Sequence, residues 1–129
     1  MELLFLLGRV LFGGYFILMG INHFKNPAGL IAYANSKKLP YPKASVYISG
    51  LMLFLGGLGV VTGAFYVTAL WLLVIFLLVS AFSMHNYWKA STTEAKTADK
   101  ASFQRNLALA GASLMLATMQ AEWIYSVMF

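Results

Sequence analysis

The stretch AFYVTALWLLVIFLLVSAFSM, residues 64–84, is the clearest sign of the fold, because it contains no charged residue. A helix needs about 20 apolar residues to cross roughly 30 Å of hydrocarbon. Three further apolar stretches reach or approach that length, at residues 3–24, 44–62 and 103–127. Such continuous runs exclude the alternating pattern of a membrane β-barrel. The sequence therefore predicts an all-α fold, an integral membrane four-helix bundle that forms a single domain over residues 1–129.

The composition supports the same class of protein. Of 129 residues, 60% are hydrophobic and 10% are charged, and the mean hydropathy is +0.75. Soluble domains carry about 25% charged residues. The chain has no cysteine, which excludes disulfide scaffolds, thiolate metal sites, iron–sulfur clusters and c-type haem attachment.

The charged residues lie between the apolar runs, although the net charge is +5. This placement is typical of topology determinants that face anionic headgroups, so we expect a lipid bilayer and no nucleic acid as partner. Residues 25–43 and 89–105 hold eight basic residues, whereas Arg9 stands alone on the other side. The positive-inside rule then predicts cytoplasmic loops and two non-cytoplasmic termini.

Each of the two basic loops has its own expected structure. Asn26 followed by Pro27 is typical of a helix start, and Pro40 prevents helix before the second span. We therefore expect a short interfacial helix over residues 27–35. The loop over residues 89–102 is small, polar and mixed in charge, and we expect it to be exposed.

Small residues recur at helical spacing on the spans, which lets helices approach closely in lipid. On the first span, Gly13 and Gly20 share a narrow face with Arg9 and His23. The residues that we expect to form helix contacts are Gly13, Gly20, Gly56, Gly57, Gly59, Gly63, Ala110, Ser113 and Ala117.

Arg9 is the residue that a bilayer tolerates least, because it lies roughly 9 Å inside the outer end of the first span. Two interpretations are open. In the structural one, its side chain reaches toward the headgroups and bonds to Gln120, which matches it in depth. In the functional one, Arg9 holds an anionic or quinone-like ligand.

A second polar group gathers at the predicted cytoplasmic ends of the spans. His23 closes the first span, His85 follows the third, and Arg105 and Asn106 open the fourth. Such residues could bind and protonate a quinone headgroup, the two histidines could ligate haem, or the group could be ordinary interfacial anchoring. Two histidines without nearby carboxylates are an incomplete ligand set, so we expect no metal site.

Several of these residues also carry a family resemblance. They lie in the ordered runs Gly8-Arg9-Val10-Leu11, Gly20-Ile21-Asn22-His23-Phe24, Leu39-Pro40, Gly56-Gly57, His85-Asn86-Tyr87-Trp88 and Arg105-Asn106-Leu107-Ala108-Leu109-Ala110-Gly111. Together these runs resemble the DoxX family over nearly the whole chain. The resemblance implies a four-helix, multi-pass protein of the inner membrane of a bacterial or archaeal cell.

The family includes the membrane subunit of a thiosulfate:quinone oxidoreductase. The resemblance therefore implies a subunit of, or an accessory to, a quinone-linked membrane oxidoreductase complex, with other membrane subunits as partners. No intrinsic cofactor is expected, and quinone is preferred to haem as the bound ligand. The candidate ligand-binding residues are Arg9, His23, His85, Arg105 and Asn106.

The chain departs from the family pattern at two places. Leu53, Phe54 and Leu55 stand where many members have a Glu before the paired glycines, and His23 stands where many have Lys. The missing Glu, together with the lack of a built-in redox centre, favours an alternative function. In that alternative, the chain is a non-catalytic helical subunit that packs against a larger membrane complex or binds lipid.

Overall fold

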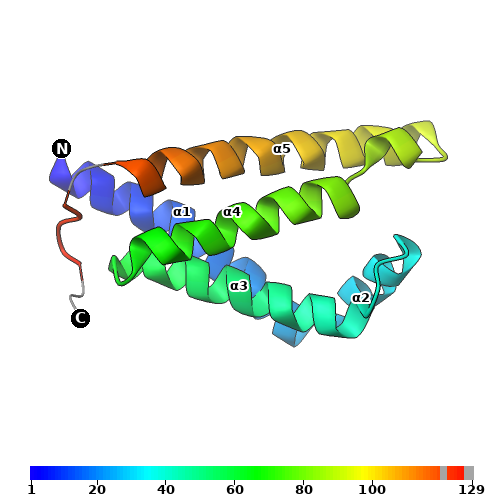
Figure 1. Ribbon diagram of the computed structural model, residues 1–129, viewed down its shortest axis with the longest axis horizontal. Helices are drawn as coiled ribbons and strands as arrows, with labels where there is room; N and C mark the ends of the chain where they lie inside the picture. Colours follow the sequence, from blue (N-terminus) through cyan, green and yellow to red (C-terminus); the bar gives the residue numbers. More distant parts are fainter. Residues whose placement is uncertain (120–121, 127–129) are drawn as a thin grey trace.

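The computed structural model describes residues 1–119 and 122–126, and the regular secondary structure of this part of the chain consists of helices, with no strand. Four long helices lie along the long axis of the molecule (Figure 1). They are α1 (Glu2–Lys25), α3 (Pro42–Thr62), α4 (Tyr66–Ser83) and α5 (Thr93–Thr118). The short elements are α2 (Pro27–Ser36) and the 3-10 helix η1 (Tyr87–Lys89). The prediction of an all-α fold is confirmed.

Three helical segments among the described residues are long and apolar enough to cross a membrane: Glu2–Lys25, Pro42–Thr62 and Tyr66–Lys89. They correspond to the first three predicted spans and make the chain a membrane protein. The fourth differs from its prediction, because α5 begins at Thr93 and ends at Thr118 rather than running from 103 to 127. Part of that predicted end lies outside the described residues.

Local chemistry explains the early start of α5. The Thr92 hydroxyl accepts a hydrogen bond from the backbone nitrogen of Ala95 at 3.1 Å, which caps the helix, and the negative charge of Glu94 in the first turn favours the same end. The segment predicted to be an exposed loop is therefore largely helical. A continuous apolar stretch begins only at Leu107, so the described helix is less apolar than the other three.

The long helices pack in chain order, and α3 has neighbours on both sides. It contacts α1 on one side and α4 on the other, and α5 contacts α4. Within the described residues the backbones of α1 and α5 do not come close. Buried side chains from all four helices, including Phe16, Leu53, Leu73 and Ala110, form a single core.

Glycine allows the backbones of α1 and α3 to touch. A Cβ atom on Gly57 would lie 2.5 Å from the carbonyl oxygen of Gly13, and one on Gly20 would lie 2.8 Å from that of Gly50. On the opposite side of α3, a Cβ on Gly59 would lie 2.4 Å from the Cβ of Ala69 in α4. Because lipid provides no hydrophobic force between spans, this close packing is what holds the helices together.

The other residues that were expected at helix contacts lie against α4, at the end of α3 and on α5. Gly56 faces Leu73 of α4, and Gly63 has a φ of +77° where α3 ends, a conformation that glycine adopts without strain. Ala110 and Ser113 of α5 are buried, and Ala117 is half-buried.

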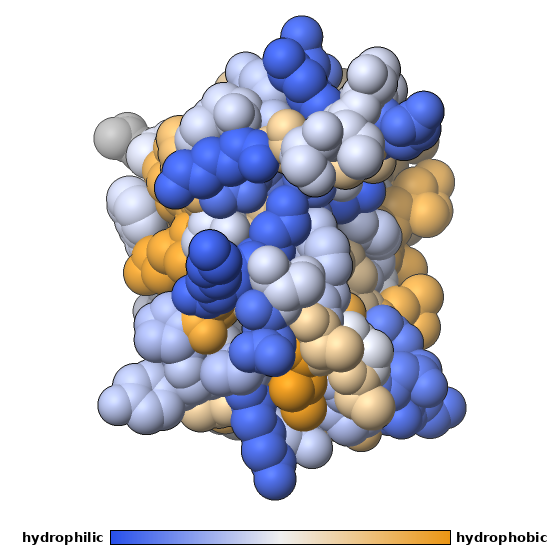
Figure 2. All heavy atoms as spheres, turned by 90° about the vertical axis from the view of Figure 1, so that its right-hand side faces the viewer, coloured by the Kyte–Doolittle hydropathy of each residue, from blue (hydrophilic) through white to orange (hydrophobic). Residues whose placement is uncertain are grey.

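The two ends of the bundle differ in chemistry. The N-terminus and the segment after α5 lie at one end, and α2 and the α4–α5 connection lie at the other, which we name the polar end (Figure 1). Figure 2 looks onto the polar end and shows hydrophilic side chains spread across it. The exposed basic residues of the elements and loops at this end are Lys25, Lys38, Lys43, Lys89, Lys96, Lys100 and Arg105.

The glycine contact can be tested with two Gly→Ala substitutions. Gly57→Ala is expected to lower the free energy of unfolding by about 1–3 kcal/mol, because the methyl group would overlap the backbone of α1. Gly14→Ala is the matched control, since a Cβ at Gly14 has no other atom within 4 Å. Thermal unfolding in detergent measures both, and equal loss of stability in the two variants would contradict the contact.

Candidate functional site

A cavity of about 460 Å³ lies near the polar end, among α1, α2, α3 and α4. Four polar or charged side chains from four different segments line it: His23 of α1, Tyr33 of α2, His85 after α4, and Arg105 of α5. The rest of the wall is apolar or carries serine hydroxyls. A mainly apolar wall with a few convergent polar groups is typical of small-molecule sites.

The cavity also reaches the outer surface of the bundle. Ile48 of α3 and Ile75 and Val79 of α4 line it and are 61%, 50% and 59% exposed. All three lie on membrane-spanning helices, where exposed apolar side chains face lipid. A lipid-soluble molecule can therefore reach the cavity from the bilayer.

His23 is held by the helix that carries it and by its neighbours. Its Nδ1 lies 2.8 Å from the carbonyl oxygen of Met19, one turn earlier in α1. The side chain packs on α3, because a Cβ on Gly50 would lie 2.6 Å from the Cβ of His23. The imidazole also meets the ring of Phe76 of α4 at 6.4 Å between centroids.

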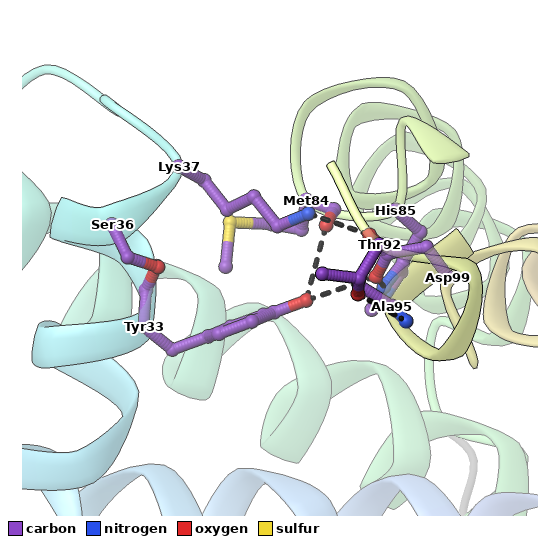
Figure 3. A network of polar contacts seen from close by, with 8 residues as sticks. All are labelled: Tyr33, Ser36, Lys37, Met84, His85, Thr92, Ala95 and Asp99. Atoms are coloured by element: carbon purple, nitrogen blue, oxygen red, sulfur yellow. Dashed lines mark hydrogen bonds and ion pairs between the residues drawn. The ribbon is translucent and has the colours of Figure 1, made fainter. Parts of the chain in front are cut away.

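Asp99 of α5 is the centre of a polar network beside the cavity (Figure 3). It is only 7% exposed. Lys37 Nζ donates to its Oδ2 at 2.7 Å, and the Tyr33 hydroxyl lies 3.2 Å both from its Oδ1 and from the Met84 carbonyl oxygen. Because Tyr33 and Lys37 belong to α2 and its C-terminal end, the network ties that segment to the α4–α5 connection.

The network keeps Asp99 ionised. Burial raises the pKa of Asp99, but the hydrogen bond and charge of Lys37, with smaller contributions from Tyr33 and His85, bring it below its ordinary value. Burial and the negative charge of Asp99 raise the pKa of Tyr33 to about 12. At neutral pH the network therefore contains a carboxylate, an ammonium group and a neutral phenol.

His85 lies between this network and the cavity. Its Nδ1 is 3.8 Å from Asp99 Oδ1, which is an ion-pair distance rather than a hydrogen bond. Nδ1 is buried and has no hydrogen-bond partner in the described part of the chain. The negative charge beside this nitrogen belongs to a carboxylate, which can only accept a hydrogen bond.

Arg9 lies at the opposite end, 3% exposed. Its Nε donates to the Val60 carbonyl oxygen at 3.1 Å and its Nη2 to that of Val61 at 2.9 Å, while Nη1 bonds to the Ile124 carbonyl. The guanidinium carbon is 5.3 Å from the ring centroid of Trp123. The last carbonyls of α3 have no partner within the helix, so a cation there is favourable.

These contacts describe a structural anchor. Arg9 joins the end of α3 to the segment after α5, whereas the partner expected from the sequence, Gln120, lies outside the described residues. Along α1, Arg9 and His23 are separated by about 21 Å at 1.5 Å per residue. Arg9 is therefore remote from the cavity.

Of the five candidate ligand residues, the structure brings His23, His85 and Arg105 to one cavity. Asn106 is buried on α5 but is not part of the lining, and Arg9 is distant. The network residues Tyr33, Lys37 and Asp99 are not among the site residues predicted from the sequence. The sequence offered one signal for Asp99. It is the sole aspartate of the chain, and it lies in the segment that follows Thr92, a residue type that often begins a helix.

The described residues contain no group of three or more His, Cys, Asp or Glu side chains that could hold a metal ion. The chemistry that the cavity side chains themselves offer is hydrogen bonding and proton exchange.

These features define a small helical membrane protein with a cavity at one end of its spans. The family model of DoxX matches residues 4–86, from α1 to just after His85. The chain belongs to the DoxX family. The match ends before α5, so Arg105 and Asn106 lie beyond it. No curated protein and no solved structure matches the chain.

The structural role of Arg9 leads to a test by substitution. Arg9→Leu is expected to reduce folded protein sharply, because each buried carbonyl left unpaired costs about 1–3 kcal/mol. Arg105→Leu is the control, since Arg105 is exposed. Gel filtration and thermal unfolding in detergent report the outcome. Normal folding of Arg9→Leu would show that the contacts are dispensable.

The Asp99 network leads to a test by pH. Because the folded-state pKa of Asp99 is depressed, its contribution is present at neutral pH and is lost as pH falls through that pKa, below about pH 4. Thermal unfolding between neutral and acid pH is expected to show this loss in the native chain and a smaller loss in Asp99→Asn. Glu94→Gln, on the same helix but exposed, should change the native profile less than Asp99→Asn does. Identical profiles for all three chains would refute the linkage.

Proposed function

We propose that this DoxX-family protein is a subunit of, or an accessory to, a quinone-linked membrane oxidoreductase complex, and that the cavity binds the quinone headgroup. The observation that carries the proposal is the cavity itself, in which two histidines, a tyrosine and an arginine meet an apolar wall that is open to lipid.

The two parts of the cavity match the two parts of a quinone. The polar side chains can form hydrogen bonds to ring oxygens, and imidazole is the side chain best suited to proton exchange near neutral pH. The exposed side chains at its mouth, Ile48, Ile75 and Val79, would lie beside the isoprenoid tail. The volume of about 460 Å³ is within the range of ordinary ligand sites, roughly 300–1,000 Å³.

The proposal assigns ligand binding to this chain and electron transfer to partner subunits. A chain without cysteine cannot hold a thiolate-bound cluster. We further propose that the basic residues place the polar end on the cytoplasmic side of the inner membrane, with both termini on the opposite side.

The alternative function, a non-catalytic packing or lipid-binding subunit, has one observation in its favour. Arg9, the charge buried most deeply along a span, bonds to backbone carbonyls and is remote from the cavity. In that case the cavity would hold a phospholipid chain instead of a quinone.

The experiment is mild-detergent purification from native membranes, followed by extraction and quantification of quinone per chain. Val79→Trp is expected to lower bound quinone at least about tenfold, because the indole would block the mouth of the cavity. Val67→Trp is the matched control: it lies on the same helix, is 41% exposed and is not part of the lining.

Near-stoichiometric quinone that is lost only in Val79→Trp, together with a co-migrating redox subunit, would support the proposal. Quinone no higher than in bulk lipid would contradict it, as would equal quinone in both variants. Bound phospholipid without quinone would establish the alternative.

A further inference from the structure

The hydrogen-bonding character of the cavity follows from the contacts that its side chains already make. His23 Nδ1 lies 2.8 Å from the Met19 carbonyl oxygen, which can only accept. Nδ1 must therefore carry the proton. In the neutral ring, Nε2 is left with a lone pair and acts as an acceptor for a ligand.

His85 is also expected to carry its proton on Nδ1, but here the partner is a carboxylate instead of a backbone carbonyl. The ring nitrogen that faces Asp99 is 3.8 Å from a carboxylate oxygen, and the negative charge favours a proton on that nitrogen. The opposite nitrogen, Nε2, is again the acceptor. In both histidines that line the cavity, Nε2 thus carries the lone pair.

Most hydroxyl groups of the lining already donate their proton in a hydrogen bond within the protein. Tyr33 directs its proton to Asp99 or to the Met84 carbonyl. Three serines of the lining donate to backbone carbonyls, namely Ser45 to Pro40, Ser49 to Val46 and Ser83 to Val79. Arg105 and Ser80 remain as donors, whereas the imidazole nitrogens and the hydroxyl oxygens of the lining are acceptors.

We propose that the cavity selects the reduced, hydroxyl-bearing form of its ligand, a quinol, over the oxidised quinone. This inference rests on the proposed function. A quinol donates through two hydroxyl groups and satisfies the histidine lone pairs. A quinone has carbonyl oxygens that only accept, so it would leave those nitrogens unpaired, and a site built for a donor discriminates strongly against an analogue without one.

Asp99 is the positioning residue for this selectivity. It does not line the cavity, but it faces His85 and sets which nitrogen of that ring carries the proton. Asp99 is itself held by Lys37 and Tyr33, and the charges of Lys37 and Arg105 also act on His85. An asparagine at this position can donate to the imidazole and favour the opposite tautomer, which would turn Nε2 into a donor.

The test uses the full chain in phospholipid nanodiscs, with decylubiquinol and decylubiquinone as probes, under argon and against empty nanodiscs. The native chain is expected to bind the quinol at least about tenfold more tightly. Asp99→Asn is expected to lower this preference about tenfold. Lys37→Arg keeps a cationic donor beside Asp99 and therefore keeps the carboxylate ionised, so it should retain the preference.

The outcomes separate this inference from the function on which it rests. Equal or tighter binding of the quinone would overturn the selectivity and leave the proposed function standing. No binding of either probe would overturn both. An unchanged preference for the quinol in Asp99→Asn would show that Asp99 is not the positioning residue.

A second measurement needs no variant. The chain has two histidines, so ¹⁵N spectra of the labelled protein contain two imidazoles. At a pH where both rings are neutral, an unprotonated Nε2 in each would support the inference. A protonated Nε2 in either ring would contradict the arrangement of acceptors.

Discussion

Close backbone contact between α1 and α3 is the constraint on which the rest of the structure depends. Apolar side chains gain nothing by leaving lipid, so spans associate where small residues let backbones touch. Gly13 against Gly57 provides such a contact. The same face of α1 places Arg9 beside the end of α3 and, further along, His23 against Gly50. One packing face therefore positions both the buried anchor and a histidine of the cavity.

The polar end completes the site by joining two parts of the bundle. α2 packs against α1 and α3, whereas Asp99 belongs to α5, which packs against α4. Lys37 and Tyr33 connect α2 to Asp99, and the cavity lies between the connected parts. A buried carboxylate is retained at such a place only when it is paired. Asp99 also lies 3.8 Å from His85, which lines the cavity, so the contacts that close the bundle are adjacent to the cavity.

Much of the fold could be predicted from the sequence, because span length and hydrophobicity are local properties. The first three spans and the short helix after Pro27 follow from apolar runs and helix-start residues. The fourth span was less predictable. Its apolar stretch resembles a span, but capping by Thr92 extends α5 into the loop region, and the helix ends at Thr118. Intrinsic helix propensity determines such helix boundaries less strongly than capping and packing do.

For the site, the sequence by itself determined that His23, His85 and Arg105 stand at the same ends of the spans, because depth in a bilayer follows from position along a helix. Only the tertiary structure decided that they share a cavity and that Asp99 is buried beside it. It also decided that Arg9 binds carbonyls of α3 and of the segment after α5. Such contacts join residues far apart in the chain and depend on how each helix is rotated about its axis, which a local pattern does not specify.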